Sequence, residues 1–285
     1  MSIDFNTFKN CLESSKLLID GGVQAREVAE RHFRIFSCLS ALDLQGPTLD
    51  VACGNALFYP AIKNYKPAML PYAVTDLQER NIICEDQEVT CSKFECEKER
   101  LPLNDKSVNT ILFCDVLEHL IVDPVWVVLE FNRVLKEGGH LIISTPNATH
   151  IRRVFEILQG FNSATEHHIK PTSIYQRHNR EWTLREIATM LRICGFGEEI
   201  FSTHKELLGE LESSFLEYAR KIGLTKLEDE EFGPEIFFAA KKKEHKTLDS
   251  ELSIDERWPD WLYTHYPNYR CRPKVFPIVI GDDYA

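Results

Sequence analysis

A short segment near residue 50 limits the folds open to this chain more than any other part of its sequence. Residues 48–58 read Thr-Leu-Asp-Val-Ala-Cys-Gly-Asn-Ala-Leu-Phe: an apolar run that contains Asp50, a turn of small residues, and an apolar segment of helical character. A strand that turns sharply into a helix brings backbone N–H groups to one point, where a polar ligand can bind. Only small residues let a ligand approach the backbone so closely. The segment therefore predicts a strand–turn–helix unit with a ligand-binding loop.

Beyond Gly46-Pro47, the sequence alternates between strand and helix patterns, which is typical of a parallel sheet covered by helices on both faces. Helices are predicted at residues 124–135 and 183–194, the second with Thr183 and Glu186 as a capping box. The seven predicted strands are residues 48–52, 72–76, 88–91, 108–114, 139–144, 199–204 and 235–240.

The remaining segments divide the chain into three predicted parts. Two amphipathic helices within residues 1–45 would form an N-terminal helical cap, and residues 46–243 would form the main domain. Within that domain, residues 160–182 are predicted as a lid or acceptor loop and residues 205–223 as a helical insertion. Residues 244–285 would form an aromatic tail, whose rings either stack on sugars or anchor the tail to its own domain or a second subunit. The rings in question are Trp258, Trp261, Tyr263, Tyr266 and Tyr269.

Composition excludes several classes of function. The net charge is −11 and no segment carries a dominant stripe of Lys and Arg, so a nucleic-acid partner is not expected. No apolar run reaches the length of a membrane span, and the N-terminus lacks the features of a secretory signal. The nine cysteines are scattered without a Cys-x-x-Cys pair, which predicts free thiols in a reducing cytoplasm and no zinc ribbon.

Five short motifs resemble, in order and spacing, the class I S-adenosylmethionine-dependent methyltransferases. They are Leu49–Phe58, Val74–Leu77, Leu101–Val108, Asp115–Leu120 and Arg133–Gly139. The resemblance covers roughly residues 45–200.

The resemblance has specific implications for the fold and the ligands. It implies an α/β, Rossmann-like, doubly wound sheet of seven mostly parallel strands with an antiparallel last strand, an N-terminal helical cap and a C-terminal extension. It also implies S-adenosyl-L-methionine as cofactor. The segment His178–Thr183, followed by an amphipathic helix, looks like a subgroup that acts on sugars and small metabolites. A homodimer stays open.

Two carboxylates at strand ends are the main candidates for cofactor contacts. Asp76 would accept both hydroxyls of the ribose, unless it only caps a turn. Asp50 would orient the loop and meet the amino group of the methionine part, unless it is an ordinary strand-end residue. The resemblance places Glu97 and Lys98 at the adenine, although their charged run could be a solvated loop. The full predicted cofactor set is Asp50, Ala52, Cys53, Gly54, Asn55, Asp76, Leu77, Glu97, Lys98 and Cys114.

The small-residue turn departs from the family pattern. The family has Gly-x-Gly-x-Gly, whereas Ala52 and Ala56 replace the first and third glycines here and only Gly54 remains. Alanine does not readily adopt a positive φ. If both alanines have ordinary torsions, the cofactor fits; if they do not, binding is weakened or lost. A non-catalytic, Rossmann-like nucleotide-binding protein is therefore an alternative.

The reaction implied is in-line displacement at a sulfonium methyl, for which the protein mainly aligns the reactants. A hydroxyl acceptor, most plausibly on a sugar, nucleotide-sugar or glycan precursor, also needs a base, and a neutral histidine suits that role. The candidates are His119, His168 and His178, with His167 beside them; His119 could instead only orient the start of a helix. The alternative acceptor is an amine or a carboxylate of another metabolite.

A metal site is considered and not predicted. Glu118, His119, His167 and His168 could bind a divalent ion, as a Glu/His cluster does in some related RNA-end methyltransferases. The Glu-x-x-Glu-His-His spacing of those enzymes is absent, and adjacent histidines do not readily point into one site.

Overall fold

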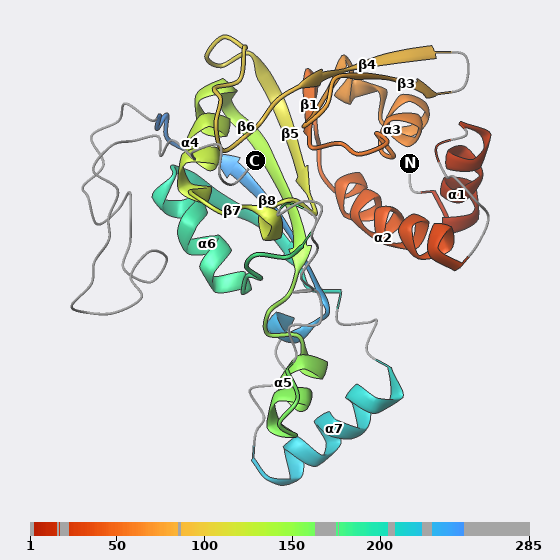
Figure 1. Cartoon of the computed structure of the whole chain (residues 1–285), viewed down its shortest axis with the longest axis vertical. Coiled ribbons are helices and arrows are strands. Elements are labelled where there is room, and N and C mark those ends of the chain that lie inside the picture. Colours follow the sequence, from red (N-terminus) through yellow and green to blue (C-terminus); the bar gives the residue numbers. More distant parts are fainter. Residues whose placement is uncertain are drawn as a thin grey trace. The chain divides into compact units, whose positions relative to one another are not determined.

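The computed structural model describes residues 3–15, 17, 23–84, 87–162, 175, 177–204, 209–223 and 230–247 (Figure 1). Within these residues eight strands form one sheet in the order β3-β4-β2-β1-β5-β6-β8-β7. The strands are β1 (Thr48–Val51), β2 (Tyr72–Asp76), β3 (Arg80–Cys84), β4 (Gln87–Lys93), β5 (Val108–Cys114), β6 (Leu135–Pro146), β7 (Phe196–Ser202) and β8 (Glu235–Lys242).

Strand directions confirm the predicted Rossmann-like α/β fold. Strand β1 pairs in parallel with β2 and β5, and β2 pairs in parallel with β4. Strands β7 and β8 pair antiparallel, as expected for the last strand. The sheet has eight strands rather than seven because β3 forms an antiparallel hairpin with β4. The five residues of β3 form a strand because they pair with β4. Their own sequence pattern does not reveal this pairing.

The chain divides into two compact units. Unit 1 comprises Met1–Glu95, Leu101–Cys114 and Val134–Ile142; unit 2 comprises Cys96–Arg100, Asp115–Arg133 and the described residues from Ile143 onward. The two predicted N-terminal helices are present and belong to the same unit as β1 and β2. The boundaries predicted at residues 45 and 243 stay a prediction.

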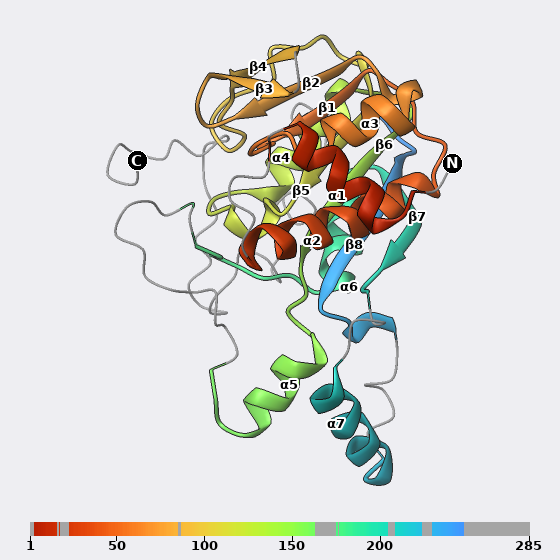
Figure 2. The ribbon, with the colours of Figure 1, turned by 90° about the vertical axis from the view of Figure 1, so that its right-hand side faces the viewer.

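In unit 1, helices α1 (Phe5–Ser14), α2 (Val23–Ser40) and α3 (Tyr59–Tyr65) lie together (Figure 2). Asp4 is the N-cap of helix α1, and its carboxylate accepts the N–H of Thr7 at 2.7 Å. Phe8 packs on Phe36 of α2 with ring centroids 5.5 Å apart. Every residue of β1 is buried, so the loop that follows starts from a fixed point inside the sheet.

In unit 2, helices α4 (Pro124–Val134) and α6 (Leu184–Ile193) are joined by polar contacts in the interior. Buried Asn132 of α4 donates its amide to the carbonyls of Cys194 at 2.7 Å and Glu244 at 2.9 Å. The predicted capping box at the start of α6 is confirmed, with Thr183 and Glu186 bonded in both directions. The short 3₁₀-helices of the chain are η1 (Pro67–Met69), η2 (Leu117–His119) and η6 (Glu230–Phe232).

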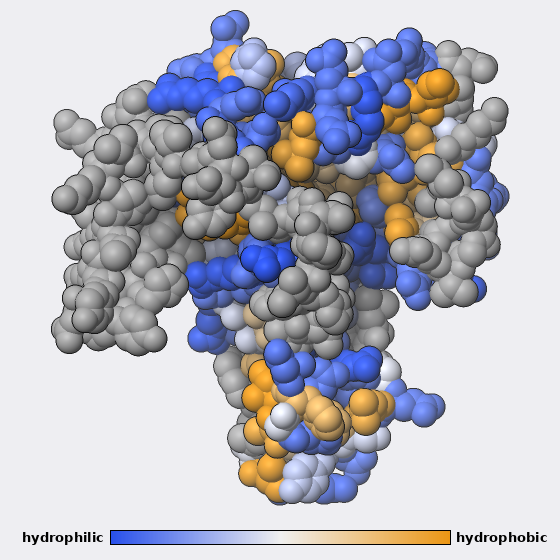
Figure 3. Space-filling view, viewed as in Figure 1, coloured by the Kyte–Doolittle hydropathy of each residue, from blue (hydrophilic) through white to orange (hydrophobic). Residues whose placement is uncertain are grey.

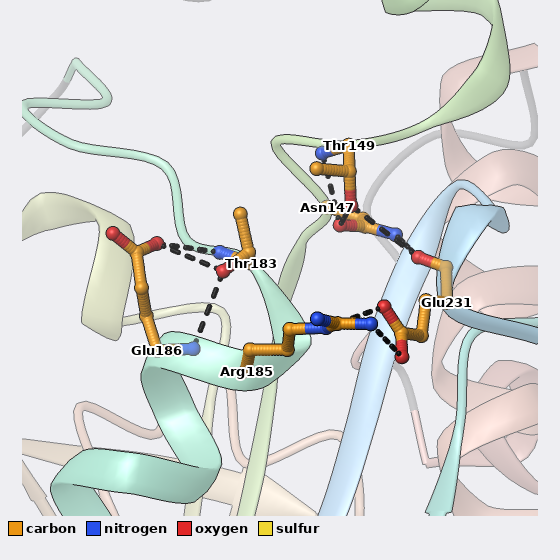
Figure 4. Close-up of polar contacts among 6 residues, drawn as sticks. All are labelled: Asn147, Thr149, Thr183, Arg185, Glu186 and Glu231. Atoms are coloured by element: carbon orange, nitrogen blue, oxygen red, sulfur yellow. Dashed lines mark hydrogen bonds and ion pairs between the residues drawn. The ribbon is translucent and has the colours of Figure 1, made fainter. Parts of the chain in front are cut away.

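A second set of contacts fixes the segment after β6 (Figure 4). The amide of buried Asn147 donates to the carbonyl of Glu231 at 2.8 Å, and its oxygen accepts the N–H of Thr149 at 3.1 Å. Arg185 of α6 forms two bonds with the Glu231 carboxylate, at 2.8 and 3.0 Å. These bonds connect the residue after β6 and helix α6 to η6, the 3₁₀-helix that precedes β8.

Helices α5 (Ile151–Leu158) and α7 (Glu210–Lys221) pack on each other through Phe155 and Phe215, whose ring centroids are 4.9 Å apart. Helix α7 lies in the predicted insertion at 205–223. Apolar side chains gather on the surface over these two helices (Figure 3). They include Ile157, Leu158, Phe161, Leu211, Tyr218 and Ile222.

Most of the predicted lid at 160–182 and all the aromatic residues of the predicted tail lie outside the described residues. The eight cysteines of the described residues form no disulfide with one another. Within the same residues, no helix has both the length and the apolar character that crossing a lipid bilayer requires.

Candidate functional site

The loop after β1 has an unusual backbone. The φ angles of Ala52, Gly54 and Ala56 are 55°, 52° and 53°, all in the left-handed region. That conformation costs an L-residue about 1–2 kcal/mol. The loop is held by the N–H of Cys53, which donates to the Thr75 carbonyl at 3.0 Å. Both alanines thus adopt left-handed torsions that suit glycine. The expectation that the cofactor fits applied to ordinary torsions at both positions, and neither alanine has them.

Asp50 lies within β1, and only 3% of it is exposed. The hydroxyl of Tyr72, the first residue of β2, donates to its Oδ2 at 2.5 Å. Burial raises the pKa of Asp50 to about 7, although the bond from Tyr72 opposes the shift. The carboxyl therefore changes charge near neutral pH, where a bound cation would favour its ionised form.

Asp76 is the last residue of β2 and is half-buried. Its Oδ1 accepts the N–H of Leu77 at 2.7 Å, and its Oδ2 accepts Nη2 of Arg80 at 2.7 Å. The same nitrogen of Arg80 donates to the carbonyl of Gly54. Unit 1 therefore brings Asp76 and the small-residue loop together, as the sequence predicts. The exposed residues beside them are Gly54, Asn55 and Leu77.

Glu97 has a well-defined partner set in unit 2. Its buried carboxylate accepts the N–H groups of Ile121 at 2.9 Å, Val122 at 2.7 Å and Asp123 at 3.3 Å. Burial raises the pKa of Glu97, and these bonds oppose the rise. The side chain thus organises the turn before α4, and its contact with adenine stays a prediction. Lys98 is exposed.

Cys114 ends β5 and is half-buried. Cys53 lies with its sulfur 3.8 Å from that of buried Cys91 on β4. The predicted cofactor contacts of Cys53 and Cys114 also stay predictions.

Two histidines that are far apart in the sequence meet in unit 2. The rings of His119, at the end of η2, and His178 lie 5.0 Å apart between centroids, at an interplanar angle of 79°. Nδ1 of His119 lies 3.0 Å from the carbonyl oxygen of Arg177, and Nδ1 of His178 lies 3.0 Å from Oε1 of Glu181. A carbonyl oxygen only accepts, and an ionised carboxylate does too, so Nδ1 carries the proton in both rings. Nε2 then carries the lone pair when the rings are neutral.

Buried Glu118 completes this cluster. Its Oε1 lies 3.9 Å from Nε2 of His119, and its Oε2 accepts the hydroxyl of Thr145 at 2.9 Å. The backbone N–H of Asn179 donates to the Glu118 carbonyl at 2.8 Å, and its side chain donates to the His119 carbonyl at 2.9 Å. These bonds attach the segment that carries His178 to the segment that carries His119.

The same cluster has the donor atoms of a metal site. One ligand atom each from Glu118, His119 and His178 lies within 4.8 Å of the other two, and such a set could hold a divalent ion. The set differs from the one considered in the sequence, since His178 takes the place there given to His167 and His168. Both of those residues lie outside the described residues, and the prediction of no metal stays a prediction.

Sequence reasoning missed three supporting residues. Tyr72 supports Asp50, Glu181 supports His178, and Arg80 binds both Asp76 and the cofactor loop. A signal for Glu181 was present, because it follows His178 by three residues. A buried strand carboxylate such as Asp50 requires a donor, but the sequence does not say which side chain provides it.

Comparisons with known proteins show which family and which folds the chain is similar to. Residues 49–143 match a family model described as "Methyltransferase domain". A search of curated protein sequences found no match to the chain. Among solved structures, a SAM-dependent methyltransferase from Archaeoglobus fulgidus is 18% identical, with a TM-score of 0.51 over 76% of this chain and 94% of that chain.

A chain of the Haloferax volcanii complex that contains the Trm112 methyltransferase activator also shares the fold. It is 11% identical, with a TM-score of 0.51 over 86% of this chain and 100% of that chain. At these identities the solved structures establish a shared fold. The family match, which covers a third of the chain, and the shared fold support S-adenosylmethionine as the cofactor.

Proposed function

We propose that this protein transfers the methyl group of S-adenosylmethionine to a hydroxyl of a small molecule, most plausibly a sugar, nucleotide-sugar or glycan precursor. The observation that carries the proposal is the His119–His178 pair, with each Nδ1 held by an oxygen. That arrangement leaves Nε2 as the basic atom, and a hydroxyl acceptor is the acceptor class that most needs a base.

In this proposal the two strand-end carboxylates of unit 1 hold the cofactor. Asp76 accepts the ribose hydroxyls, and ionised Asp50 attracts the positively charged amino group of the methionine part. The loop at residues 52–56 would bind the ligand through its backbone N–H groups, as the strand–turn–helix pattern predicts. The remaining predicted contacts are those of Cys53, Asn55, Leu77, Glu97, Lys98 and Cys114.

The chemical step needs one base and one leaving group. The acceptor oxygen forms a bond to the methyl carbon as the carbon–sulfur bond breaks, and the electron pair of that bond remains on sulfur. Nε2 of His119 or His178 takes the hydroxyl proton, and the imidazolium later releases it to solvent. The products are a methyl ether and S-adenosylhomocysteine.

A screen with radiolabelled methyl donor tests the acceptor class. Free sugars, glycans and nucleotide-sugars form one panel, and amines and carboxylates of matched size form the other. We expect label in a hydroxyl of the first panel, at a rate that falls when His119 or His178 is replaced. Label only in the second panel would contradict O-methylation and support the N- or carboxyl-methyltransferase alternative.

The alternative of a non-catalytic nucleotide-binding protein has one observation in its favour, the left-handed torsions of Ala52 and Ala56. Methyl transfer to any acceptor would exclude it. We propose the cytoplasm as the location, because cysteines scattered without a Cys-x-x-Cys pair are typical of a reducing compartment. A homodimer stays a prediction that the mass of the protein in solution can test.

A further inference from the structure

We propose that Arg80 competes with the ribose of the cofactor for Asp76 and must move away from this carboxylate when the cofactor binds. Arg80 would thus act as an internal competitor that sets the cofactor affinity. This inference rests on the proposed role of Asp76 as the carboxylate that binds the ribose.

The contacts of Arg80 lie within unit 1. Arg80 is the first residue of β3, and its Nη2 donates to Oδ2 of Asp76 at 2.7 Å and to the carbonyl of Gly54. Its Nη1 lies 3.4 Å from the carbonyl of Gln78. The side chains of Arg80 and Asp76 are 34% and 19% exposed, so solvent and ligands reach the pair.

These contacts conflict with a bound ribose. A single nitrogen atom within hydrogen-bond distance of both Gly54 and Asp76 spans the space between the loop and the carboxylate. A ribose that bonds to Asp76 beside this loop needs the same space, because the small-residue turn serves to let the ligand approach the backbone. The guanidinium of Arg80 and the ribose therefore cannot occupy this space at the same time.

The carboxylate adds a second conflict. Oδ1 of Asp76 already accepts the N–H of Leu77, and Oδ2 accepts Arg80. Displacement of Arg80 frees Oδ2 and the Gly54 carbonyl together. The cofactor must then replace an ion pair as well as water, which lowers its apparent affinity.

The expected size of the effect follows from the exposure of the pair. A partly exposed ion pair contributes modestly, so loss of the guanidinium should tighten cofactor binding by about three- to tenfold. If Arg80 only supported the loop, loss of its guanidinium should weaken cofactor binding instead. The direction of the change therefore separates competition from support.

Calorimetric titration of S-adenosylhomocysteine into the full chain tests the proposal. The variants are Arg80→Ala and Arg80→Met, the second of which keeps most of the aliphatic stem in case alanine loosens β3. Arg26→Ala is the matched control, because Arg26 forms an i,i+4 pair with Glu30 at 2.8 Å in α2. We expect about three- to tenfold tighter binding in a folded Arg80 variant and unchanged binding in the control.

The variant Asp76→Ala separates the proposed role of Arg80 from the proposed role of Asp76. In that background, an Arg80 substitution should change the affinity by less than about twofold, since its target is gone. Unchanged or weaker binding in the Arg80 variants, with weaker binding in Asp76→Ala, would overturn the role of Arg80 and leave that of Asp76 intact. Unchanged binding in Asp76→Ala would overturn both.

Discussion

The cofactor loop of unit 1 and the histidine cluster of unit 2 are built in different ways. In unit 1, Asp50, Asp76 and the loop lie on or directly after parallel strands that pair with each other. In unit 2, His119 ends the 3₁₀-helix η2 and His178 lies far along the chain, and polar contacts of Glu118 and Asn179 join them. The comparison teaches that regular strand pairing places the proposed cofactor groups, whereas individual tertiary hydrogen bonds place the proposed base.

The comparison predicts that changes at His119 or His178 should affect turnover, and that changes at Asp76 or the loop after β1 should affect cofactor binding. The largest expected effect is on turnover. His119→Ala or His178→Ala should lower kcat about 10²–10⁴-fold if that residue is the base. Affinity for S-adenosylhomocysteine should stay within about twofold. His150→Ala, at the start of α5, is the control, and normal turnover in both variants would remove the base from unit 2.

Asp50 should make stability depend on pH. Its pKa is raised from 3.8 to about 7, so the stability of its neutral form is fully present below about pH 4 and is lost as the pH rises through 7. The loss is at most about 4 kcal/mol. Asp50→Asn keeps an acceptor for Tyr72 and should flatten the fall in unfolding free energy between pH 4 and 8.

Urea titrations at several pH values measure this difference, with the exposed carboxylate variant Asp43→Asn as control. Parallel pH profiles for wild type and Asp50→Asn would show that Asp50 is ionised throughout the range.

Asp76→Ala should weaken binding of S-adenosylmethionine by about 1–3 kcal/mol, because the ribose loses its acceptor. The fold and the turnover at saturating cofactor should be unchanged. Calorimetry gives the affinity and a thermal melt checks the fold. Wild-type affinity in the variant would place the ribose elsewhere.

The smallest expected effect concerns the left-handed loop. Ala52→Gly should relieve backbone strain and stabilise the protein by up to about 1 kcal/mol. Ala56→Gly should gain less, since the buried methyl group of Ala56 is lost. Denaturant unfolding measures both, and a destabilised Ala52→Gly would argue against strain at this position.

The contrast between the units also explains what the sequence could predict. Apolar periodicity and turn residues predicted β1, β2 and β5 closely, because burial inside a parallel sheet demands apolar side chains. The same logic placed Asp50 and Asp76 on neighbouring strands. It could not place β3, whose structure depends on its hairpin with β4.

Side-chain partners were the least predictable part. The pairing of His119 with His178 depends on Asn179 and Arg177, whose bonds form only in the folded chain. Likewise, the torsions of Ala52 and Ala56 follow from the turn that the strand and helix impose, against the preference of alanine.

Hydrogen–deuterium exchange with and without S-adenosylhomocysteine tests the location of the cofactor most directly. Added ligand should slow amide exchange in residues 52–56 and 76–80 and leave α5 and α7 unchanged. Unaltered exchange in residues 52–56 and 76–80, at a ligand concentration that saturates the protein, would contradict the assignment of the cofactor to the loop after β1 and the end of β2.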